Sequence, residues 1–522
     1  MFCSRRLIPI AAGVLPLQIG DLLEFQKFRA TEYHDMAIDF YAKKLCRGLS
    51  VPRYAAVQCD NRDKFPLPFP PSMRPSMQKK PAYLCFKEIN IADPAAVLNK
   101  FPALKSALSK YEKTKHEGAK NATDLLDWII DKVKTPCELP FPRDENDEKM
   151  KVIVSAETCV HALCYAILGH GLDPVWDQNQ KDPNKLHSKE QARKGGLDFQ
   201  ELLTSELDIS AEKVECLLHY FSLMAMENSN KTRNVSFHIQ EFKPNIETYF
   251  GNEKTWPTVI METGTDMSSN PIFGVFANKC YGFGRVTKSE NGMSQEEIVQ
   301  MTNPELLIYM LYCGNTGEKE AIVAKNIQRF SLSSGFKKTF KCTGPCMNEQ
   351  HSIIVFMDAL IYNSELPRSK GDSEHNVSTT KIQQFYACNV KRDVTKAIAA
   401  FQGQDTISTG KWGCGQFGGC LYLKILQQIL AGAGAHNMKT MKFHLFDSTK
   451  KERKTCEDLM NDIKSAWSKS DLYEFLTTLD HKAFPIDAKN PIKDEDINQI
   501  FLALWRKENT RKQAQVRTDN DR

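Results

Sequence analysis

The 522-residue sequence contains no run of about 18 consecutive apolar residues, so we expect no membrane-spanning helix. Its 16 cysteines form no C-x-x-C pair, and Cys342 and Cys346 lack a histidine pair at zinc-finger spacing. We therefore expect reduced thiols in an intracellular compartment and no bound metal. The net charge of +5 is small for this length, so it is compatible with an anionic ligand without requiring a nucleic acid.

The sequence also lacks an internal repeat, and its length exceeds what one ordinary hydrophobic core accommodates. Its hydrophobic fraction of 41% is typical of a globular protein, so we expect at least two structured parts. We predict four segments: an N-terminal extension and linker over 1–80, a helical accessory domain over 81–240, an α/β domain over 241–480, and a C-terminal helix with a polar tail over 481–522.

The N-terminus has an apolar stretch, residues 7–17, directly after Arg5 and Arg6. A signal or transit segment has a similar composition, but two prolines and the absence of a clear cleavage pattern argue against one. We therefore expect a buried N-terminal extension rather than mitochondrial targeting. The prolines, lysines and methionines of residues 60–80 predict an irregular or extended linker after it.

Apolar residues recur at helical spacing in the region before residue 240. One stripe, from Val160 to Leu168, follows Ser155, and serine favours the N-cap position of a helix. A second stripe runs from Val214 to Ala225. The polar residues 174–196 between the two stripes predict a loop.

Near residue 235 the pattern changes, because short β-rich runs begin to alternate with helical segments. Such alternation indicates a layered α/β domain. The expected strands are 258–262, 272–277, 320–325, 352–357, 405–409 and 440–446, and the expected helices are 295–312, 392–401 and 418–433. The charged tail beyond about residue 505 is expected to fray.

Two adjacent glutamates, Glu296 and Glu297, follow Gln295 at the head of the predicted helix 295–312. With Ser294 at the N-cap and Glu297 at the third helical position, the segment fits a capping box. A catalytic function would instead require one glutamate to stay protonated near neutral pH. Adjacent carboxylates raise each other's pKa, whereas a helix N-terminus lowers both, so the pattern leaves both interpretations open.

The most glycine-rich segment, residues 409–419, joins a predicted strand to a long apolar helix and holds five glycines. Glycine lets backbone N–H groups converge on an anion, and a helix N-terminus favours negative charge. The alternative is a tight turn that needs positive φ angles. A second loop, Gly282 to Gly284, also follows a predicted strand and suits a phosphate or ribose contact. It is not a G-x-G-x-x-G motif, so it does not predict a dinucleotide fold.

Together these motifs resemble the poly(ADP-ribose) glycohydrolase family. The resemblance implies a macrodomain-like mixed sheet between helices, with a helical accessory domain N-terminal to it. Residues 331–340 are similar to the family segment that carries an adenosine-side tyrosine, and residues 217–221 resemble part of the accessory domain. The matching motifs are 275–279, 282–284, 295–297, 303–306 and 409–419, of which the last is the most specific.

The resemblance implies that Glu297 is the general acid, which protonates the oxygen leaving from the ribose–ribose bond. Glu296 would position that ribose through its hydroxyls. The implied substrate-binding residues are Met261, Glu262, Asn278, Gly282, Gly284, Gln295, Phe336, Lys411, Trp412, Gly413, Cys414, Gly415, Gln416, Phe417 and Phe446. The resemblance implies no cofactor and no metal.

The implied partner is poly(ADP-ribose) on ADP-ribosylated proteins. We expect no direct nucleic-acid binding, no membrane association and a monomer. The family acts in the nucleus and cytoplasm, in the DNA damage response, and we expect one or both compartments here.

Four positions depart from the family pattern. Val275 stands where the family has aspartate, Phe283 replaces the middle glycine of the second loop, Lys411 replaces asparagine, and Phe336 replaces tyrosine. Two hypotheses follow: an active glycohydrolase, or a weakened or inactive paralogue that binds ADP-ribose or acts as a scaffold. Under the second hypothesis, the double change Val275→Asp and Phe283→Gly would restore activity. A third reading, an unrelated α/β protein, does not explain residues 409–419.

Overall fold

The computed structural model describes most of the chain beyond residue 93. The residues it describes are 82–84, 94–134, 137–139, 143–144, 150–169, 172, 196–226, 232–262, 267–278, 281–282, 292–312, 316–348, 350–362, 381–479 and 494–520. The predicted N-terminal extension, most of the loop predicted over 174–196, Phe283 and Gly284 therefore lie outside the described residues.

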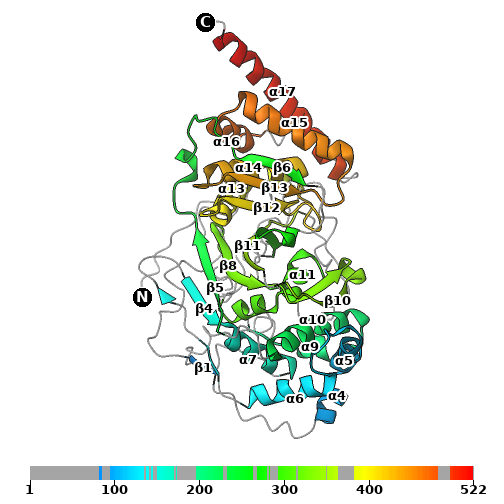
Figure 1. Ribbon diagram of the computed structural model, residues 1–522. Coiled ribbons are helices and arrows are strands. Elements are labelled where there is room, and N and C mark those ends of the chain that lie inside the picture. The colour runs from blue at the N-terminus through cyan, green and yellow to red at the C-terminus, as the bar shows by residue number, and fades with distance from the viewer. Residues whose placement is uncertain are drawn as a thin grey trace, which may run out of the picture.

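Nine strands of the described part form one mixed sheet, in the order β3-β4-β5-β8-β11-β7-β12-β13-β6 (Figure 1). The five strands from β11 to β6 run parallel to their neighbours, and the remaining pairs are antiparallel. The bounds are β3 Arg143–Asp144, β4 Met150–Ser155, β5 Asn234–Glu241, β6 Thr258–Glu262, β7 Ile272–Ala277, β8 Glu320–Gln328, β11 His351–Asp358, β12 Thr406–Gly410 and β13 Thr440–His444.

The sheet is covered on both faces, because alternate residues of its central strands enter two different apolar clusters. In β8, Ile322 and Ala324 belong to one cluster, and Ala321 and Val323 to the other. The first cluster includes residues of α5 Pro102–Thr114, α6 Ala122–Val133, α7 Ala156–Ile167, α10 Asp208–Ala225, α11 Gln295–Thr302 and the 3₁₀ helix η5 Pro304–Leu311. The second includes residues of α13 Ala387–Phe401, α14 Leu421–Gly434, α15 Lys450–Ala466, α16 Lys469–Thr477 and α17 Asp494–Asn520.

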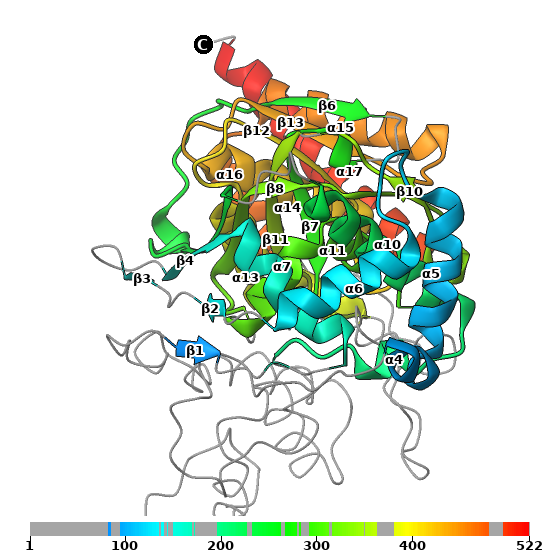
Figure 2. The same cartoon turned by 60° about the horizontal axis from the view of Figure 1, so that its bottom comes forward.

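Helices α15, α16 and α17 lie at the end of the molecule opposite α4, α5 and α6 (Figures 1 and 2). Two small antiparallel sheets flank the main one, β1 with β2 and β9 with β10. The remaining elements are β1 Ala82–Leu84, α4 Pro94–Lys100, β2 Cys137–Leu139, α9 Gln200–Leu203, β9 Ser331–Ser334, β10 Lys341–Pro345 and the 3₁₀ helices η3 Ile246–Thr248, η4 Met267–Ser269, η6 Lys337–Thr339 and η7 Gln383–Phe385. No helix among the described residues is long and apolar enough to cross a membrane.

The predicted fold class, a mixed sheet between helices, is confirmed. Each of the six predicted strands overlaps a strand of the main sheet, and the two helical stripes are α7 and α10. Ser155 caps α7 as predicted, since its side chain accepts a hydrogen bond from the backbone N–H of Thr158 at 3.1 Å. The structure differs from the predicted division near residue 240, because β3, β4 and β5 belong to the main sheet rather than to a separate helical domain.

Two further predictions are wrong in detail. The single helix predicted over 295–312 divides at Asn303, because Pro304 has no N–H to continue the helical hydrogen bonds. The tail beyond residue 505 does not fray, since α17 continues to Asn520. Its apolar residues anchor the helix: the indole of Trp505 stacks on that of Trp467 with ring centroids 4.6 Å apart.

Candidate functional site

The parallel part of the sheet brings the carboxyl ends of β6, β7, β11, β12 and β13 to one edge. Gly410 at the end of β12 pairs with His444 of β13, which in turn pairs with Glu262 of β6. Ligand sites of open parallel sheets form at this edge. Strand β7 pairs with β12 only at Phe273 and Ser408, so hydrogen-bonding groups of β7 nearer this edge need other partners.

The side chain of Gln295 supplies partners to β7. Its Nε2 donates to the carbonyl of Gly274 at 3.1 Å, and its Oε1 accepts from the backbone N–H of Phe276 at 3.1 Å. The amide thus bonds to the strand as another strand's backbone would. This contact fixes the first turn of α11 against the carboxyl end of β7.

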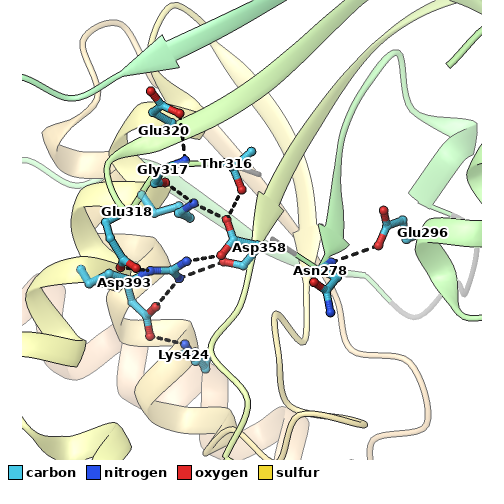
Figure 3. A network of polar contacts seen from close by, with 11 residues as sticks. Asn278, Glu296, Thr316, Gly317, Glu318, Glu320, Asp358, Asp393 and Lys424 are labelled. Atoms are coloured by element: carbon cyan, nitrogen blue, oxygen red, sulfur yellow. Dashed lines mark hydrogen bonds and ion pairs between the residues drawn. The ribbon is translucent and has the colours of Figure 1, made fainter. Parts of the chain in front are cut away.

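Glu296 holds the chain where it leaves β7. Its carboxylate accepts hydrogen bonds from the backbone N–H groups of Asn278, at 3.0 Å, and Gly282, at 2.9 Å. Figure 3 shows the bond to Asn278. Gly282 has a φ of +75°, a conformation that glycine adopts without steric cost. The buried carboxylate also accepts from Nε2 of Gln300 at 3.2 Å, so Glu296 is bonded on both oxygens.

Glu297 forms the predicted capping box. Its Oε2 accepts from the backbone N–H of Ser294 at 3.1 Å and from the Ser294 hydroxyl. The side chain is buried, with 7% of the residue exposed, and burial raises the pKa of Glu297 above its ordinary value, against the Ser294 bonds and the charge of Lys213. Oε2 accepts both of these hydrogen bonds from Ser294, and Oε1 takes no part in the capping box. Capping and acid catalysis are therefore compatible in one carboxylate.

Lys213 is a residue near this site that sequence reasoning missed. It lies on α10, is fully buried, and α10 packs against α11. Burial lowers the pKa of Lys213 to about 8, while the charge of Glu297 opposes that shift. The available signal was a lysine directly beside the apolar stripe that begins at Val214. A buried ammonium near a carboxylate stabilises the ionised form of that carboxylate.

The glycine-rich segment 409–419 forms a compact loop between β12 and α14. Gly413 has a φ of +70°, and a Cβ there would lie 2.8 Å from Cβ of Ala359, so both space and conformation require glycine. The backbone N–H of Gly419 donates to the carbonyl of Gly413 at 2.8 Å. From α14, Nε2 of Gln428 donates to the carbonyl of Gly410 at 3.0 Å. These contacts hold the loop directly ahead of α14.

The side chain of Trp412 supports this loop from the protein interior. Its side chain is fully buried, and Nζ of Lys424 lies 4.3 Å from its ring centroid. The implied substrate contact of Trp412 is therefore restricted to its backbone. Gly415 and Gln416 are exposed, whereas Lys411, Cys414 and Phe417 are half-buried.

A buried charge network lies beside the loop (Figure 3). Asp358, at the end of β11, accepts hydrogen bonds from Arg392, Lys396 and the hydroxyl of Thr316, the last at 2.7 Å. Burial opposes ionisation of Asp358, but Arg392 and Lys396 outweigh it and hold the pKa below its ordinary value. Arg392 also pairs with Asp393, which in turn pairs with Lys424. The network thus connects the end of β11 to the lysine that supports Trp412.

Two implied aromatic contacts are exposed. Phe336, in the connection between β9 and β10, is 44% exposed, and Phe446, just beyond β13, is 54% exposed. The backbone N–H of Lys337 donates to the carbonyl of Met293 at 2.8 Å, which places the Phe336 turn beside the start of α11. Met261 and Glu262 are half-buried at the end of β6.

Val275 does not face the solvent edge of the sheet. Its side chain is fully buried in the apolar cluster that also contains Val299 and Met301 of α11. An aspartate at this position would place its carboxylate in this apolar cluster, so we do not expect Val275→Asp alone to restore activity.

The chain is similar to known proteins over the region of this site. A family model described as "Poly (ADP-ribose) glycohydrolase (PARG), Macro domain fold" matches residues 258–453. Poly(ADP-ribose) glycohydrolase 1 of Caenorhabditis elegans is 26% identical over 269 residues, covering 45% of this chain and 32% of that protein. Poly(ADP-ribose) glycohydrolase 2 of the same species is 26% identical over 380 residues, covering 69% of this chain and 70% of that protein.

A solved structure of poly(ADP-ribose) glycohydrolase from Thermomonospora curvata aligns with 48% of this chain and 98% of its own, at 11% identity and a TM-score of 0.30. The chain spans 32% of the length of the first C. elegans relative and 50% of the probable poly(ADP-ribose) glycohydrolase 2 of Arabidopsis thaliana. The matched segment 258–453 contains the strands, the first turn of α11 and the glycine-rich loop that form the site. Over this segment the chain is similar to the poly(ADP-ribose) glycohydrolase family, whose model describes a macro domain fold.

Proposed function

We propose that this protein hydrolyses the ribose–ribose glycosidic bonds of poly(ADP-ribose) and releases ADP-ribose. The observation that carries the proposal is the state of Glu297: a buried carboxylate with a raised pKa, at the ligand-binding edge of the sheet, with one oxygen outside the capping box. A raised pKa keeps a larger fraction of the carboxyl group protonated near neutral pH. The similarity of residues 258–453 to the family supports the choice of substrate.

The reaction follows from the properties of Glu297. Its carboxyl group donates a proton to the ribose oxygen that leaves, and the anomeric carbon develops oxocarbenium character. The resulting carboxylate then accepts a proton from the incoming water, so one group serves as acid and base. Lys213 assists the first half, because its charge stabilises the ionised form of Glu297 that proton donation leaves behind.

The neighbouring residues position the substrate rather than transfer protons. Glu296 fixes the backbone of Asn278 and Gly282, and Gln295 fixes β7, so the ribose contacts proposed for these residues rest on a rigid edge. The diphosphate lies along the backbone of residues 411–416, ahead of α14, where N–H groups favour an anion. Phe336 and Phe446 offer exposed rings to the adenosine end. We also propose that the polymer is attached to ADP-ribosylated proteins of the nucleus or cytoplasm.

The decisive experiment measures release of ADP-ribose from purified poly(ADP-ribose) by the wild type and by Glu297→Gln. We expect the variant to lose about 10²–10³ in rate while it keeps its thermal unfolding temperature, since glutamine retains an oxygen for the capping box. Glu452→Gln is the matched control, because Glu452 closes an equivalent capping box on α15. Equal rates in wild type and Glu297→Gln, or polymer binding without turnover in the wild type, would contradict the proposal. The second result would favour the inactive paralogue.

A further inference from the structure

A second group of chemically active side chains lies where α5, α10 and β10 meet. Glu215 and His219 occupy one face of α10, and Cys342 lies opposite them on β10. One donor atom from each of the three lies within 4.8 Å of the others, and all three residues are buried. The proposed hydrolysis does not use these residues.

The distances suit a single small cation. Oε1 of Glu215 and Nε2 of His219 are 3.7 Å apart, as the spacing of four residues on a helix allows. Two ligand atoms on one tetrahedral zinc ion are about 3.3–3.8 Å apart, given bonds of about 2.0–2.3 Å. Cys216 follows Glu215 in the chain and lies outside this three-residue group, and its thiol shares a hydrogen bond with that of Cys342.

Neighbouring residues hold these side chains in place. The hydroxyl of Thr114, on α5, donates to Oε1 of Glu215 at 2.7 Å. The backbone N–H of Cys342 donates to Oε2 of Glu212 at 2.9 Å, and Glu212 pairs with Lys110 of α5 at 2.5 Å. Outer hydrogen bonds of this kind orient the ligands of metal sites. The group therefore has the supporting contacts of a binding site as well as the donor atoms.

The types of donor atom also indicate a metal. Cys342 brings a sulfur donor within 4.8 Å of an imidazole nitrogen and a carboxylate oxygen. Thiolate with imidazole and carboxylate is a donor set for zinc, whereas magnesium and calcium take oxygen ligands.

We propose that Glu215, His219 and Cys342 bind one Zn²⁺ ion in a buried structural site, with the thiol of Cys216 beside Cys342 as the candidate fourth ligand. The ion joins α10, which carries Lys213, to the β9–β10 hairpin, whose connection carries Phe336. It thereby fixes two elements on which the proposed active site depends.

The experiment measures metal content and does not depend on glycohydrolase activity. The full chain is treated with a chelator, dialysed against Zn²⁺ or Co²⁺, freed of excess metal, and analysed by elemental mass spectrometry and visible absorption. We expect about one equivalent of metal and the charge-transfer absorption of a Co²⁺–thiolate bond. Cys342→Ser and His219→Ala should lose the bound metal. Cys346→Ser, four residues along the same segment and outside the group, should retain it.

Wild-type chain that binds no equivalent of either metal would overturn the proposal, and so would undiminished binding by Cys342→Ser. A Cys216–Cys342 disulfide found by peptide mass spectrometry in chain purified without oxidant would also overturn it. Should Cys342→Ser fail to fold, Glu215→Gln provides a milder test. The loss of one carboxylate ligand should weaken Zn²⁺ binding by about 10-fold or more, with far-ultraviolet circular dichroism unchanged.

Discussion

Two helices of this molecule begin with the same capping box, in very different surroundings. On α11, Ser294 is bonded to Glu297, which is 7% exposed. On α15, Thr449 is exposed, and its backbone N–H and hydroxyl donate to Glu452 at 2.7 and 3.0 Å. The local geometry is equivalent, but on α11 burial raises the pKa of Glu297, and the buried Lys213 lies nearby. Burial, rather than the motif, therefore makes Glu297 suitable for acid catalysis.

The largest expected effect comes from placing a charge in the apolar cluster between β7 and α11. Val275→Asp buries a carboxylate in that cluster, and we expect it to lower the free energy of unfolding by about 3 kcal/mol or more. Ile260→Asp is the control, since Ile260 lies on β6, at the edge of the sheet, and is 40% exposed. Urea denaturation measures both. A Val275→Asp variant of normal stability and higher glycohydrolase activity would show that residue 275 faces the ligand after all.

The next comparison concerns the charge beside the α11 box. Burial raises the pKa of Glu297 and Lys213 opposes that rise, so Lys213→Met should raise the pKa further. Because hydrolysis begins with protonated Glu297, activity falls as pH rises through this pKa, and the alkaline limb of the pH–rate profile should move to higher pH. Lys464→Met, on exposed α15, should leave the profile in place.

The same pKa shift has a consequence for stability. A carboxyl group whose folded-state pKa is raised contributes stability that is fully present below its unfolded pKa and is lost as pH rises through the folded pKa. In Lys213→Met this loss should continue to higher pH than in the wild type, because the folded-state pKa is raised further while the unfolded pKa is unchanged. Thermal unfolding across pH measures it. An alkaline limb or a stability profile displaced to lower pH would show that Lys213 does not act on Glu297.

The smallest effect separates capping from catalysis. Ser294→Ala and Thr449→Ala each remove one hydroxyl from a capping box, and each should cost about 1 kcal/mol of stability. Only Ser294→Ala should also raise the pKa of Glu297, because the Ser294 hydroxyl bond lowers it. The measurements are chemical denaturation and the pH–rate profile of each variant. Equal changes of the profile in both variants would remove the distinction between the two boxes.

Much of the fold followed from local patterns. The predicted strands from 258–262 to 440–446 all lie in the main sheet, and the capping box at Ser294 is present as predicted. These features depend on residues only a few positions apart, so the alternation of apolar residues and the capping residues predict them. The division of helix 295–312 also follows from a local signal, because Pro304 lies within it and proline cannot continue the helical hydrogen bonds.

Other features depended on contacts between distant segments and did not follow from such patterns. Lys213 faces the carboxylate of Glu297 only because α10 packs on α11. The scattered cysteines suggested no metal site, whereas folding brings Cys342 to Glu215 and His219. The burial of Trp412 under the glycine-rich loop likewise depends on Lys424 of α14.

The sequence alone determined six strands of the main sheet, the helices of the two apolar stripes, the capping box and the glycine-rich loop, because backbone conformation and periodic burial are properties of neighbouring residues. Only the tertiary structure decided that one box is buried and the other exposed. The reason is physical: desolvation and the Coulomb interaction with Lys213 depend on distance in space, and these quantities set the pKa of Glu297.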